Sequence, residues 1–534
     1  AITTTLHSQG RKEMKKRVLS IILAAAMAGT LAACGSSSGS SADTTAATAS
    51  ETAEGTDAAE GEAAAASDYF ETTQHLVVAF PTWTGAPKDL DMVTEEINKI
   101  LLEKHNIEIE MQIGDSGSYS QNLTLELAGG QQLDVISTLF AGYPNLVNQG
   151  YLMDLEQDDL LATYGDGIVD AIGQDFVDMC RVGGVLYGIT NTRDYAAGRG
   201  CIAVGTEYLE GIGYEFPDTD DEILRITDEE LEDILARLHE TYPDLEVYRP
   251  ANNDLVQQST IDQIGGTNFG VLTDYAQDLK VENLFTSDDY RAFCERVYSW
   301  NQKGYISKDA ATDTTSVGQL AKDGVLMAYG TGGKPGSKAQ ESLGCGRDMT
   351  IFQLKEDFLP SSGVASYPWA IPITTANPQA AMVLMKALYT DPDIANLFVY
   401  GIEGTHYELD EDGLIDTSKG SGSGNYGTLA WLYPNQFLTT PTSGNSADLW
   451  DRIKEFNDTA KKSAAAGFAF DSTPVATQLA ACTNIYNEYQ KQLEYGFLDP
   501  ETGLKEVNDK MMAAGMQDII DEKQSQLDAW AAAK

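Results

Sequence analysis

The spacing of hydrophobic residues between positions 75 and 136 switches repeatedly between the period of a strand and the period of a helix. Within residues 89–105, for example, Val93, Ile97, Ile100 and Leu101 recur on one helical face. The predicted order is a strand at His75–Phe80, a helix at Asp89–His105, a strand at Ile107–Ile113, a helix at Ser120–Leu127 and a strand at Leu133–Ile136. Strands that alternate with helices in this way predict an α/β fold with a mainly parallel sheet.

Helical spacing returns later in the chain. It predicts two consecutive helices within residues 377–401 and one long helix at Asn508–Trp530. Trp300 and Trp450 lie within helical patterns, so we expect them in the core. Residues 410–416 hint at a calcium loop, but the glycine comes two positions early and the distal glutamate is missing. An Asp-Gly hairpin turn is the expected structure there.

The stretch from Met14 to Cys34 has the three parts of a secretory signal peptide, namely basic residues, an apolar run and a small-residue end. The apolar run, Val18–Leu31, is shorter than the roughly 20 residues that a permanent membrane span needs. Leu31-Ala32-Ala33-Cys34 resembles the lipobox of bacterial lipoproteins, and this resemblance implies a lipid anchor on Cys34. An ordinary secreted protein with a chance cysteine is the alternative. Residues 1–13 precede Met14, the expected initiator, and are given no role.

Residues 35–67 consist almost entirely of Ser, Ala, Thr, Gly, Glu and Asp, without a large apolar residue. Such a segment cannot bury enough surface to offset its ordering entropy, so we expect a flexible tether. Gly35–Gly39 formally matches the G-x-S-x-G pattern of hydrolases, but that motif needs a strand before it and a helix after it. The match therefore predicts no hydrolase site.

The chain has 81 Asp and Glu against 35 Lys and Arg, a formal net charge of −46. A surface this acidic repels nucleic acid and anionic lipid, so we expect neither as a partner. The cysteines after Cys34 are scattered, without a Cys-x-x-Cys pair for metal or redox chemistry. We expect most of them to be small buried hydrophobes, although one pair among Cys180, Cys201 and Cys345 could form a disulfide.

No motif predicts a catalytic centre, a metal site or a cofactor. The five histidines show no ligand spacing. Gly330–Gly336 looks like a phosphate-binding loop, but Ala328 stands where the first glycine should be and Pro335 follows the lysine. Paired carboxylates are abundant, so a glycosidase stays open as an alternative, because its two carboxyl groups would be recognised only by their separation.

Loops rich in Gly, Ser, Pro and Asn carry aromatic residues near several predicted strand ends, where ligands of parallel sheets bind. A sugar ring has an apolar C–H face and a rim of hydroxyls, so its site needs flat aromatic rings beside fixed donors and acceptors. The residues predicted to contact the ligand are Trp83, Tyr119, Tyr143, Asn191, Arg193, Asp194, Tyr195, Tyr329, Tyr367, Trp369 and Tyr426. Arg193 and Asp194 would act as a paired donor and acceptor. Each aromatic residue has a core position as its alternative, and we favour the core for Trp431 and Tyr433.

Several stretches carry a family resemblance when they are taken in order. They are LVVAFPTW, YSQNLTLELAGGQQLDVIST, LVNQGYLMDL, GGVLYGIT, DGVLMAYG, the run from WAIPITTANP to EGTHYEL, and the ending MMAAGMQDIIDEKQSQLDAW. Together with the lipobox they resemble the extracellular solute-binding proteins of ABC importers, family 1, of the sugar-binding type found in Gram-positive bacteria. The resemblance implies a two-lobed periplasmic-binding-protein fold of type II. Each lobe would be a mainly parallel sheet flanked by helices, with the ligand cleft between the lobes.

In that family the chain crosses between the lobes several times. The expected crossings, which are also the hinge candidates, lie near Tyr187–Asn191, Met327–Gly330 and Trp369–Pro372. The expected organisation is an upstream extension with the signal peptide at 1–33, the lipidated cysteine and linker at 34–67, a first lobe at 74–190 and 328–370, and a second lobe at 191–327 and 371–534. The helix at Asn508–Trp530 would close the second lobe.

The resemblance implies a lipid-anchored protein on the extracellular face of the cell membrane, with neither enzymatic activity nor a cofactor. It would capture a carbohydrate, expected to be an oligosaccharide, and pass it to the permease subunits of an ABC importer. We expect it to be a monomer. The same lobes could instead hold a peptide or another polar solute. A surface glycosidase or an adhesin would be a different class of protein, and an adhesin should show internal repeats, of which the sequence has none.

Overall fold

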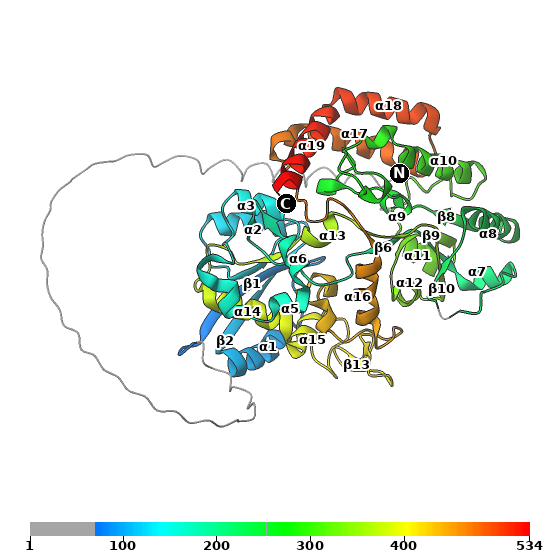
Figure 1. Ribbon diagram of the computed structural model, residues 1–534. Coiled ribbons are helices and arrows are strands. Elements are labelled where there is room, and N and C mark those ends of the chain that lie inside the picture. Colours follow the sequence, from blue (N-terminus) through cyan, green and yellow to red (C-terminus); the bar gives the residue numbers. More distant parts are fainter. Residues whose placement is uncertain (1–69, 220, 252–253, 534) are drawn as a thin grey trace, which may run out of the picture. The chain divides into compact units, whose positions relative to one another are not determined.

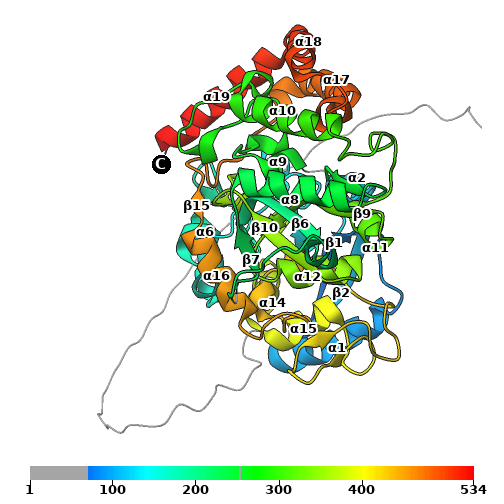
Figure 2. The same ribbon diagram turned by 90° about the vertical axis from the view of Figure 1, so that its right-hand side faces the viewer.

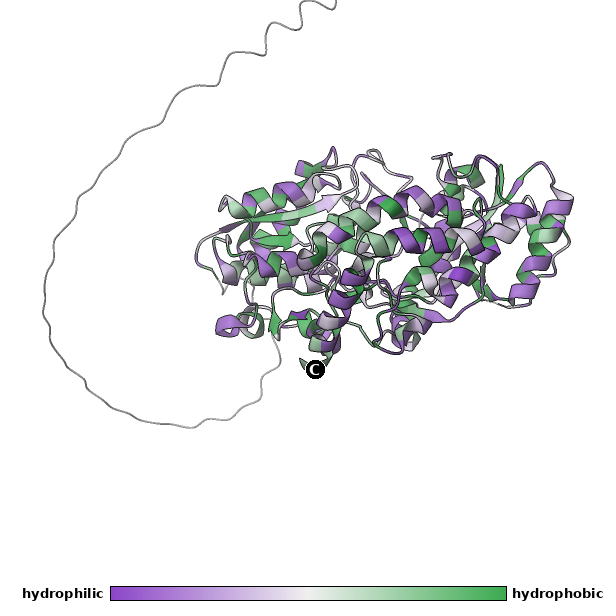
Figure 3. Cartoon of the chain, turned by 90° about the horizontal axis from the view of Figure 1, so that it is seen from above, coloured by the Kyte–Doolittle hydropathy of each residue, from purple (hydrophilic) through white to green (hydrophobic). Residues whose placement is uncertain are grey.

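The computed structural model describes residues 70–219, 221–251 and 254–533. These residues form two main β-sheets, each with its own hydrophobic core (Figure 1). We call each sheet, together with the helices packed on it, a lobe: the first lobe contains β1, and the second contains β6. In Figure 3 the strands are largely green, whereas many helices alternate green and purple along their length, as expected for buried sheets covered by amphipathic helices. The predicted signal peptide, Cys34 and the linker lie outside the described residues.

The first lobe is built on a four-stranded sheet of order β12-β3-β1-β2. Strand β1 is parallel to β2 and β3, and β12 is antiparallel to β3. Both faces of the sheet are buried, because Val78 and Phe80 of β1 pack with α1, whereas Ala79 packs with α2. The elements of this lobe are β1 (Gln74–Thr82), α1 (Leu90–His105), β2 (Ile107–Asp115), α2 (Tyr119–Ala128), β3 (Val135–Ser137), α3 (Tyr143–Asn148), η1 (Gln157–Asp159), α4 (Leu160–Tyr164), α5 (Ile168–Ile172), α6 (Gln174–Asp178), β4 (Arg181–Val182), β5 (Val185–Leu186), β12 (Trp369–Ala370), α14 (Pro378–Thr390), α15 (Pro392–Tyr400), β13 (Glu408–Leu409), β14 (Ile415–Asp416), η5 (Ala430–Leu432) and η6 (Gln436–Leu438).

The second lobe is built on a seven-stranded mixed sheet, in which β6 runs antiparallel to its neighbours β9, β10 and β11. Helices α8 and α10 pack on one face and α11 and α12 on the other (Figure 2). The elements of this lobe are β6 (Ala197–Gly205), α7 (Thr206–Gly211), β7 (Ile223–Arg225), α8 (Asp228–Thr241), β8 (Glu246–Arg249), α9 (Asp254–Gln258), η2 (Ile264–Gly266), η3 (Asp274–Ala276), η4 (Leu284–Thr286), α10 (Asp288–Gln302), α11 (Val317–Lys322), β9 (Leu326–Gly333), α12 (Ser337–Cys345), β10 (Met349–Gln353), β11 (Asp357–Leu359), α13 (Ser362–Ala365), α16 (Leu449–Thr459), β15 (Lys461–Lys462), η7 (Thr473–Val475), α17 (Ala476–Glu494), α18 (Pro500–Ala513) and α19 (Met516–Ala533).

Local chemistry explains several element boundaries. Helix α8 begins after Thr227, whose hydroxyl accepts from the Glu230 N–H while the Glu230 carboxylate accepts from the Thr227 N–H. Asn377 and Asp391 cap α14 and α15, which confirms the two helices predicted within residues 377–401. The single helix predicted at Asn508–Trp530 is wrong, because the chain turns at Gly515, where φ is +95°, and divides it into α18 and α19.

The first five predicted elements are confirmed as β1, α1, β2, α2 and β3. The Asp-Gly turn is confirmed as well, since β13 and β14 pair antiparallel around Gly413. Trp300 lies in the core with 2% of its surface exposed. Five cysteines, namely Cys180, Cys201, Cys294, Cys345 and Cys482, are buried and free, so no disulfide joins Cys180, Cys201 or Cys345.

The lobe boundaries differ from the predicted ones. Strands β9, β10 and β11 lie within residues 328–370, which were expected in the first lobe, but they pair with β6 in the second sheet. Residues 371–433, expected in the second lobe, pack instead in the first core through α14 and α15. The predicted crossing at Met327–Gly330 falls inside β9, because its apolar run is a central strand and not a connection.

Three segments connect the lobes, and they contact one another. We call residues 190–196 the first crossing, 360–368 the second and 439–448 the third. The hydroxyl of Thr190 donates to the carbonyl of Val364 over 2.6 Å, which joins the first crossing to the second. Asn457 of α16, which follows the third crossing, accepts from the N–H groups of Tyr195 and Ala196. The predicted hinges at Tyr187–Asn191 and Trp369–Pro372 therefore lie beside real crossings.

Candidate ligand-binding site

Two exposed aromatic rings lie where parallel strands of the first sheet end. Trp83 directly follows β1 and is 58% exposed, and Phe140 follows β3 and is 41% exposed. Their ring centroids are 6.0 Å apart. Phe140 has a φ of 66°, a conformation that costs a bulky residue free energy and is often found at binding sites. Neither ring is placed there by core packing alone.

The aromatic contacts continue from Trp83 towards the second crossing. The centroids of Trp83 and Trp431 are 6.2 Å apart, and those of Trp431 and Tyr367 are 5.5 Å apart. Trp431 lies in η5, whose position is fixed because the side-chain amide of Asn191 donates to the Trp431 carbonyl. Phe140, Trp83, Trp431 and Tyr367 thus form one continuous set of rings, which we call the aromatic surface.

A cluster of charged residues adjoins the aromatic surface. The guanidinium of Arg193 lies 5.0 Å from the centroid of the Tyr367 ring, and it donates to the carbonyls of Asp194 and Gly363 over 2.7 and 2.9 Å. The Asp194 carboxylate pairs with Arg193 and with Lys334, which follows β9. We call Arg193, Asp194 and Lys334 the charged cluster. It extends the line of contacts from the first lobe through two crossings into the second lobe.

The environment of Arg193 keeps its charge in place. Burial opposes that charge, but Tyr367, Asp194 and Tyr195 outweigh it and raise the pKa of Arg193. Its Nε–H is buried and has no hydrogen-bond partner among the described residues. The Arg193 side chain therefore links the first crossing to the second through its NH1 and NH2 groups, and its Nε–H is not used in these contacts.

Most of the other predicted contact residues lie in the interior. They are at most 8% exposed, and each one forms a hydrogen bond through its side-chain polar group to another part of the protein: Tyr119 to Ala79 and Ser137, Tyr143 to Cys180, Asn191 to Trp431, Tyr195 to Asn191, Tyr329 to Glu341, Trp369 to Leu432 and Tyr426 to Phe398. Burial raises the pKa of Tyr119 and Tyr143 well above the ordinary value. Most of these side chains stabilise the interior of a single lobe, and of the predicted set the structure brings Trp83, Arg193, Asp194 and Tyr367 to one surface.

Three members of this surface were not among the predicted contacts. Phe140 lies in the loop shortly after the predicted strand Leu133–Ile136, and that position was the available signal. Trp431 was expected in the core; its ring does pack partly against the first core, but it also contacts Trp83 and Tyr367. Lys334 lies in the glycine-rich stretch that had been judged only as a phosphate loop. Its pairing with Asp194 joins residues that are far apart in sequence, and no local pattern shows such a contact.

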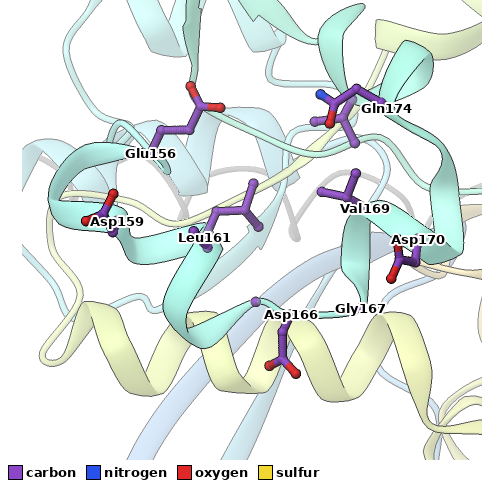
Figure 4. A pocket seen from close by; sticks show the side chains of 11 residues that line it. Glu156, Asp159, Leu161, Asp166, Gly167, Val169, Asp170 and Gln174 are labelled. Atoms are coloured by element: carbon purple, nitrogen blue, oxygen red, sulfur yellow. The ribbon is translucent and has the colours of Figure 1, made fainter.

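A separate cavity of about 380 Å³ lies within the first lobe between α4, α5 and α6. Figure 4 shows Leu161 and Val169 facing the space, with the carboxylates of Glu156, Asp159, Asp166 and Asp170 around it. Glu156 is paired with Arg181, and Asp166 with Lys386. A larger hollow of about 930 Å³ lies beside β7 and α16 in the second lobe. No residue of the aromatic surface lines either one, so both are distinct from the candidate site.

Neither a metal centre nor a membrane span is present in the part of the chain that the structure covers. Within residues 70–219, 221–251 and 254–533, no three His, Cys, Asp or Glu side chains are grouped so that they could hold a metal ion. Over the same ranges, none of the helices has both the length and the apolar character for crossing a bilayer. The candidate site itself presents flat rings, hydrogen-bonding groups and paired charges.

Two protein families match parts of this chain. Residues 96–405 match the family described as bacterial extracellular solute-binding protein. Residues 464–532 match a second family, described as a domain of unknown function (DUF3502). The solute-binding match covers more than half of the chain and includes strands of both sheets.

Individual relatives agree with this assignment. A carbohydrate ABC transporter substrate-binding protein from Streptococcus pneumoniae serotype 4 is 24% identical over 462 residues, which cover 83% of this chain and 88% of the relative. The crystal structure of the N-glycan transport solute-binding protein NgtS from S. pneumoniae has a TM-score of 0.73 at 19% identity, with 86% of this chain and 99% of that chain covered. A solute-binding protein for HMO from Bifidobacterium longum infantis has a TM-score of 0.58 at 17% identity, with 86% and 99% covered. These structures confirm the predicted two-lobed α/β fold.

Proposed function

The chain belongs to the bacterial extracellular solute-binding proteins, and from this premise we propose that it captures an oligosaccharide outside the membrane and delivers it to an ABC permease. The observation that carries the carbohydrate assignment is the aromatic surface, in which the exposed rings of Trp83 and Phe140 continue through Trp431 to Tyr367. The names of the relatives support the same class of ligand, since they include a carbohydrate transporter component and a protein for N-glycan transport.

The geometry suits a chain of sugar units better than a single sugar. A pyranose ring stacks its C–H face on a flat aromatic ring, and neighbouring rings at 6.0 and 6.2 Å offer successive stacking positions. The hydroxyl rim of the sugar needs donors and acceptors, which the charged cluster supplies at the Tyr367 end. Asp194 offsets one of the two positive charges of Arg193 and Lys334, and all three side chains carry groups that can hydrogen-bond the hydroxyls of a sugar.

The proposed mechanism is binding and release without a covalent step. A ligand that touches the aromatic surface and the charged cluster interacts with both lobes, and it stabilises a closed form in proportion to its extra affinity for that form. The closed form would dock on the permease. The acidic surface is consistent with a soluble body that avoids nucleic acid and anionic lipid.

We also propose that Cys34 carries a lipid that holds the protein on the extracellular face of the cell membrane, with residues 35–67 as a tether. This proposal rests on the sequence of residues 14–34 alone. It predicts that the protein expressed in a Gram-positive host takes up a clickable palmitate analogue and stays with the membrane fraction. Cys34→Ala should lose the label and appear in the medium; an unlabelled wild-type protein would refute the anchor.

Isothermal titration calorimetry against neutral oligosaccharides, monosaccharides, oligopeptides and amino acids tests the proposed ligand class. A saturating ligand at 100 times its Kd also raises the free energy of unfolding by about 2.7 kcal/mol, which a thermal melt detects. We expect binding of an intact oligosaccharide. Peptide binding would overturn the carbohydrate assignment, and a cleaved sugar in the sample after titration would identify an enzyme instead.

A further inference from the structure

The domain of unknown function at residues 464–532 contains α17, α18 and α19 and packs on an irregular loop of the second lobe. This loop, residues 259–287, connects α9 to α10 through short 3-10 turns and isolated β-bridges, without a longer helix or strand. Its backbone takes left-handed conformations at several positions, including Gly270 and Tyr275. A loop of this length without regular structure needs hydrogen-bond partners from outside itself.

Helix α19 supplies those partners. Lys523 is fully buried, and its side-chain amine donates to the Thr267 hydroxyl over 2.9 Å and to the Gly270 carbonyl over 2.8 Å. The neighbouring Gln524 accepts from the Val281 N–H over 2.8 Å and donates to the Leu279 carbonyl over 2.9 Å. Burying an amine is costly unless it is bonded, so these contacts fix the loop against α19.

The loop in turn holds the second crossing through one carboxylate. Asp262 is fully buried; one of its oxygens accepts from the Ser361 N–H and the other from the Ser361 hydroxyl, both over 2.8 Å. Burial raises the pKa of the Asp262 carboxyl, and the side chain of Ser463, which follows β15, lies close enough to the same carboxylate to oppose part of that rise. Backbone hydrogen bonds between Asp262 and Leu272 tie this carboxylate to the part of the loop that Lys523 holds.

We propose that the C-terminal domain is a hinge anchor: Lys523 fixes the loop, and Asp262 fixes the start of the second crossing at Ser361 and the segment that follows β15 at Ser463. Bending of the second crossing is then confined to the residues after Ser361, beginning with α13. Gly363 and Val364 of that stretch accept hydrogen bonds from Arg193 and Thr190 of the first crossing. The anchor therefore sets where the chain bends beside the candidate site.

The anchor is tested without any ligand by hydrogen–deuterium exchange of the full chain. The variants are Asp262→Asn and Lys523→Met, and the matched control is Glu494→Gln. Glu494 is also a buried carboxylate of the second lobe, at 3% exposure, but it bonds Tyr290, Tyr486 and Gln490 and no crossing.

We expect Asp262→Asn to speed exchange about tenfold in peptides that cover residues 358–366 and 460–466, because loss of a hydrogen bond to a charged group allows local opening. Lys523→Met should speed exchange at residues 264–273 and at the same crossing peptides. Glu494→Gln should act on residues 286–298 and 482–497 only. The proposal is overturned if Asp262→Asn leaves the crossing peptides as slow as they are in Glu494→Gln. If Asp262→Asn does not fold, Ser361→Ala removes one of the same hydrogen bonds at lower cost and is held to the same criterion.

The effect on ligand capture rests on the proposed function and is measured separately. A loosened crossing lowers the fraction of molecules that can close, and the apparent Kd rises in inverse proportion to that fraction. We expect about tenfold weaker oligosaccharide binding for Asp262→Asn and a change within about twofold for Glu494→Gln. A wild-type protein that binds no sugar would refute the proposed function, while the exchange data would still decide whether the anchor exists.

Discussion

Trp83→Ala is the substitution that tests the aromatic surface most directly. Trp83 is 58% exposed, so its loss costs little of the core, and only the ring contacts with Phe140 and Trp431 disappear. We expect the free energy of unfolding to fall by about 1 kcal/mol. The main effect should appear in ligand affinity.

The size of that effect follows from the exposed area of the ring. A tryptophan presents about 250 Å², of which 58% is open here. A sugar that covers one face buries roughly half of the open area, about 70 Å², and this burial contributes about 1.8 kcal/mol at about 25 cal/mol per Å². The Kd for the oligosaccharide should therefore rise about 20-fold.

Calorimetric titration of the wild type, Trp83→Ala and Phe216→Ala measures this difference. Phe216 is the matched control, because it is 42% exposed and packs on another aromatic ring, Tyr214, in the second lobe. Its substitution should leave the Kd within about twofold of wild type. Equal affinities for all three proteins would refute the assignment of the aromatic surface as the site on which the sugar stacks.

Three further substitutions separate core, charge and pH effects. Trp369→Ala removes a fully buried ring and its hydrogen bond to the Leu432 carbonyl, so we expect a loss of about 3–5 kcal/mol in a urea titration; a loss below about 1 kcal/mol would contradict its core position. Asp194→Asn leaves Arg193 and Lys334 without the carboxylate that pairs with them. Competition titrations should therefore show weaker binding of neutral oligosaccharides and stronger binding of acidic ones. An unchanged preference would exclude the charged cluster from the site. Burial raises the pKa of Glu494 from 4.5 to about 7, so between these pH values the folded chain holds a proton that the unfolded chain has released. The free energy of unfolding should therefore fall as the pH rises through this window, and thermal melts of Glu494→Gln should show a shallower fall than the wild type.

The parts of the fold that local periodicity determines were predictable. The alternation in Ile107–Ile113 and the helical spacing of Val93, Ile97 and Leu101 require the environments that β2 and α1 have. The division between lobes was not predictable in the same way. Strand β9 has the apolar run of any buried segment, and only its pairing with β6 assigns it to the second sheet.

The candidate site shows the same limit at the level of single residues. Tyr119 and Trp83 both lie near the ends of strands, and nothing in their neighbours distinguishes them. The difference is that the Tyr119 hydroxyl donates to the carbonyls of Ala79 and Ser137 beneath α2, whereas 58% of Trp83 is exposed. Whether an aromatic residue lies in the core or is exposed to a ligand depends on its contacts with distant parts of the chain.

Arg193 shows why ligand contacts and lobe movement should be analysed together in this protein. Its guanidinium stacks on Tyr367 of the aromatic surface and donates to the Gly363 carbonyl in the second crossing. A ligand that contacts Tyr367 would therefore also affect Arg193, the side chain that donates to the second crossing. Conversely, a substitution at Asp262 alters the support of Ser361, two residues before Gly363, without reaching the ligand. A change in affinity then identifies a ligand contact only when exchange at the second crossing is unchanged, so the two measurements must be made on each variant.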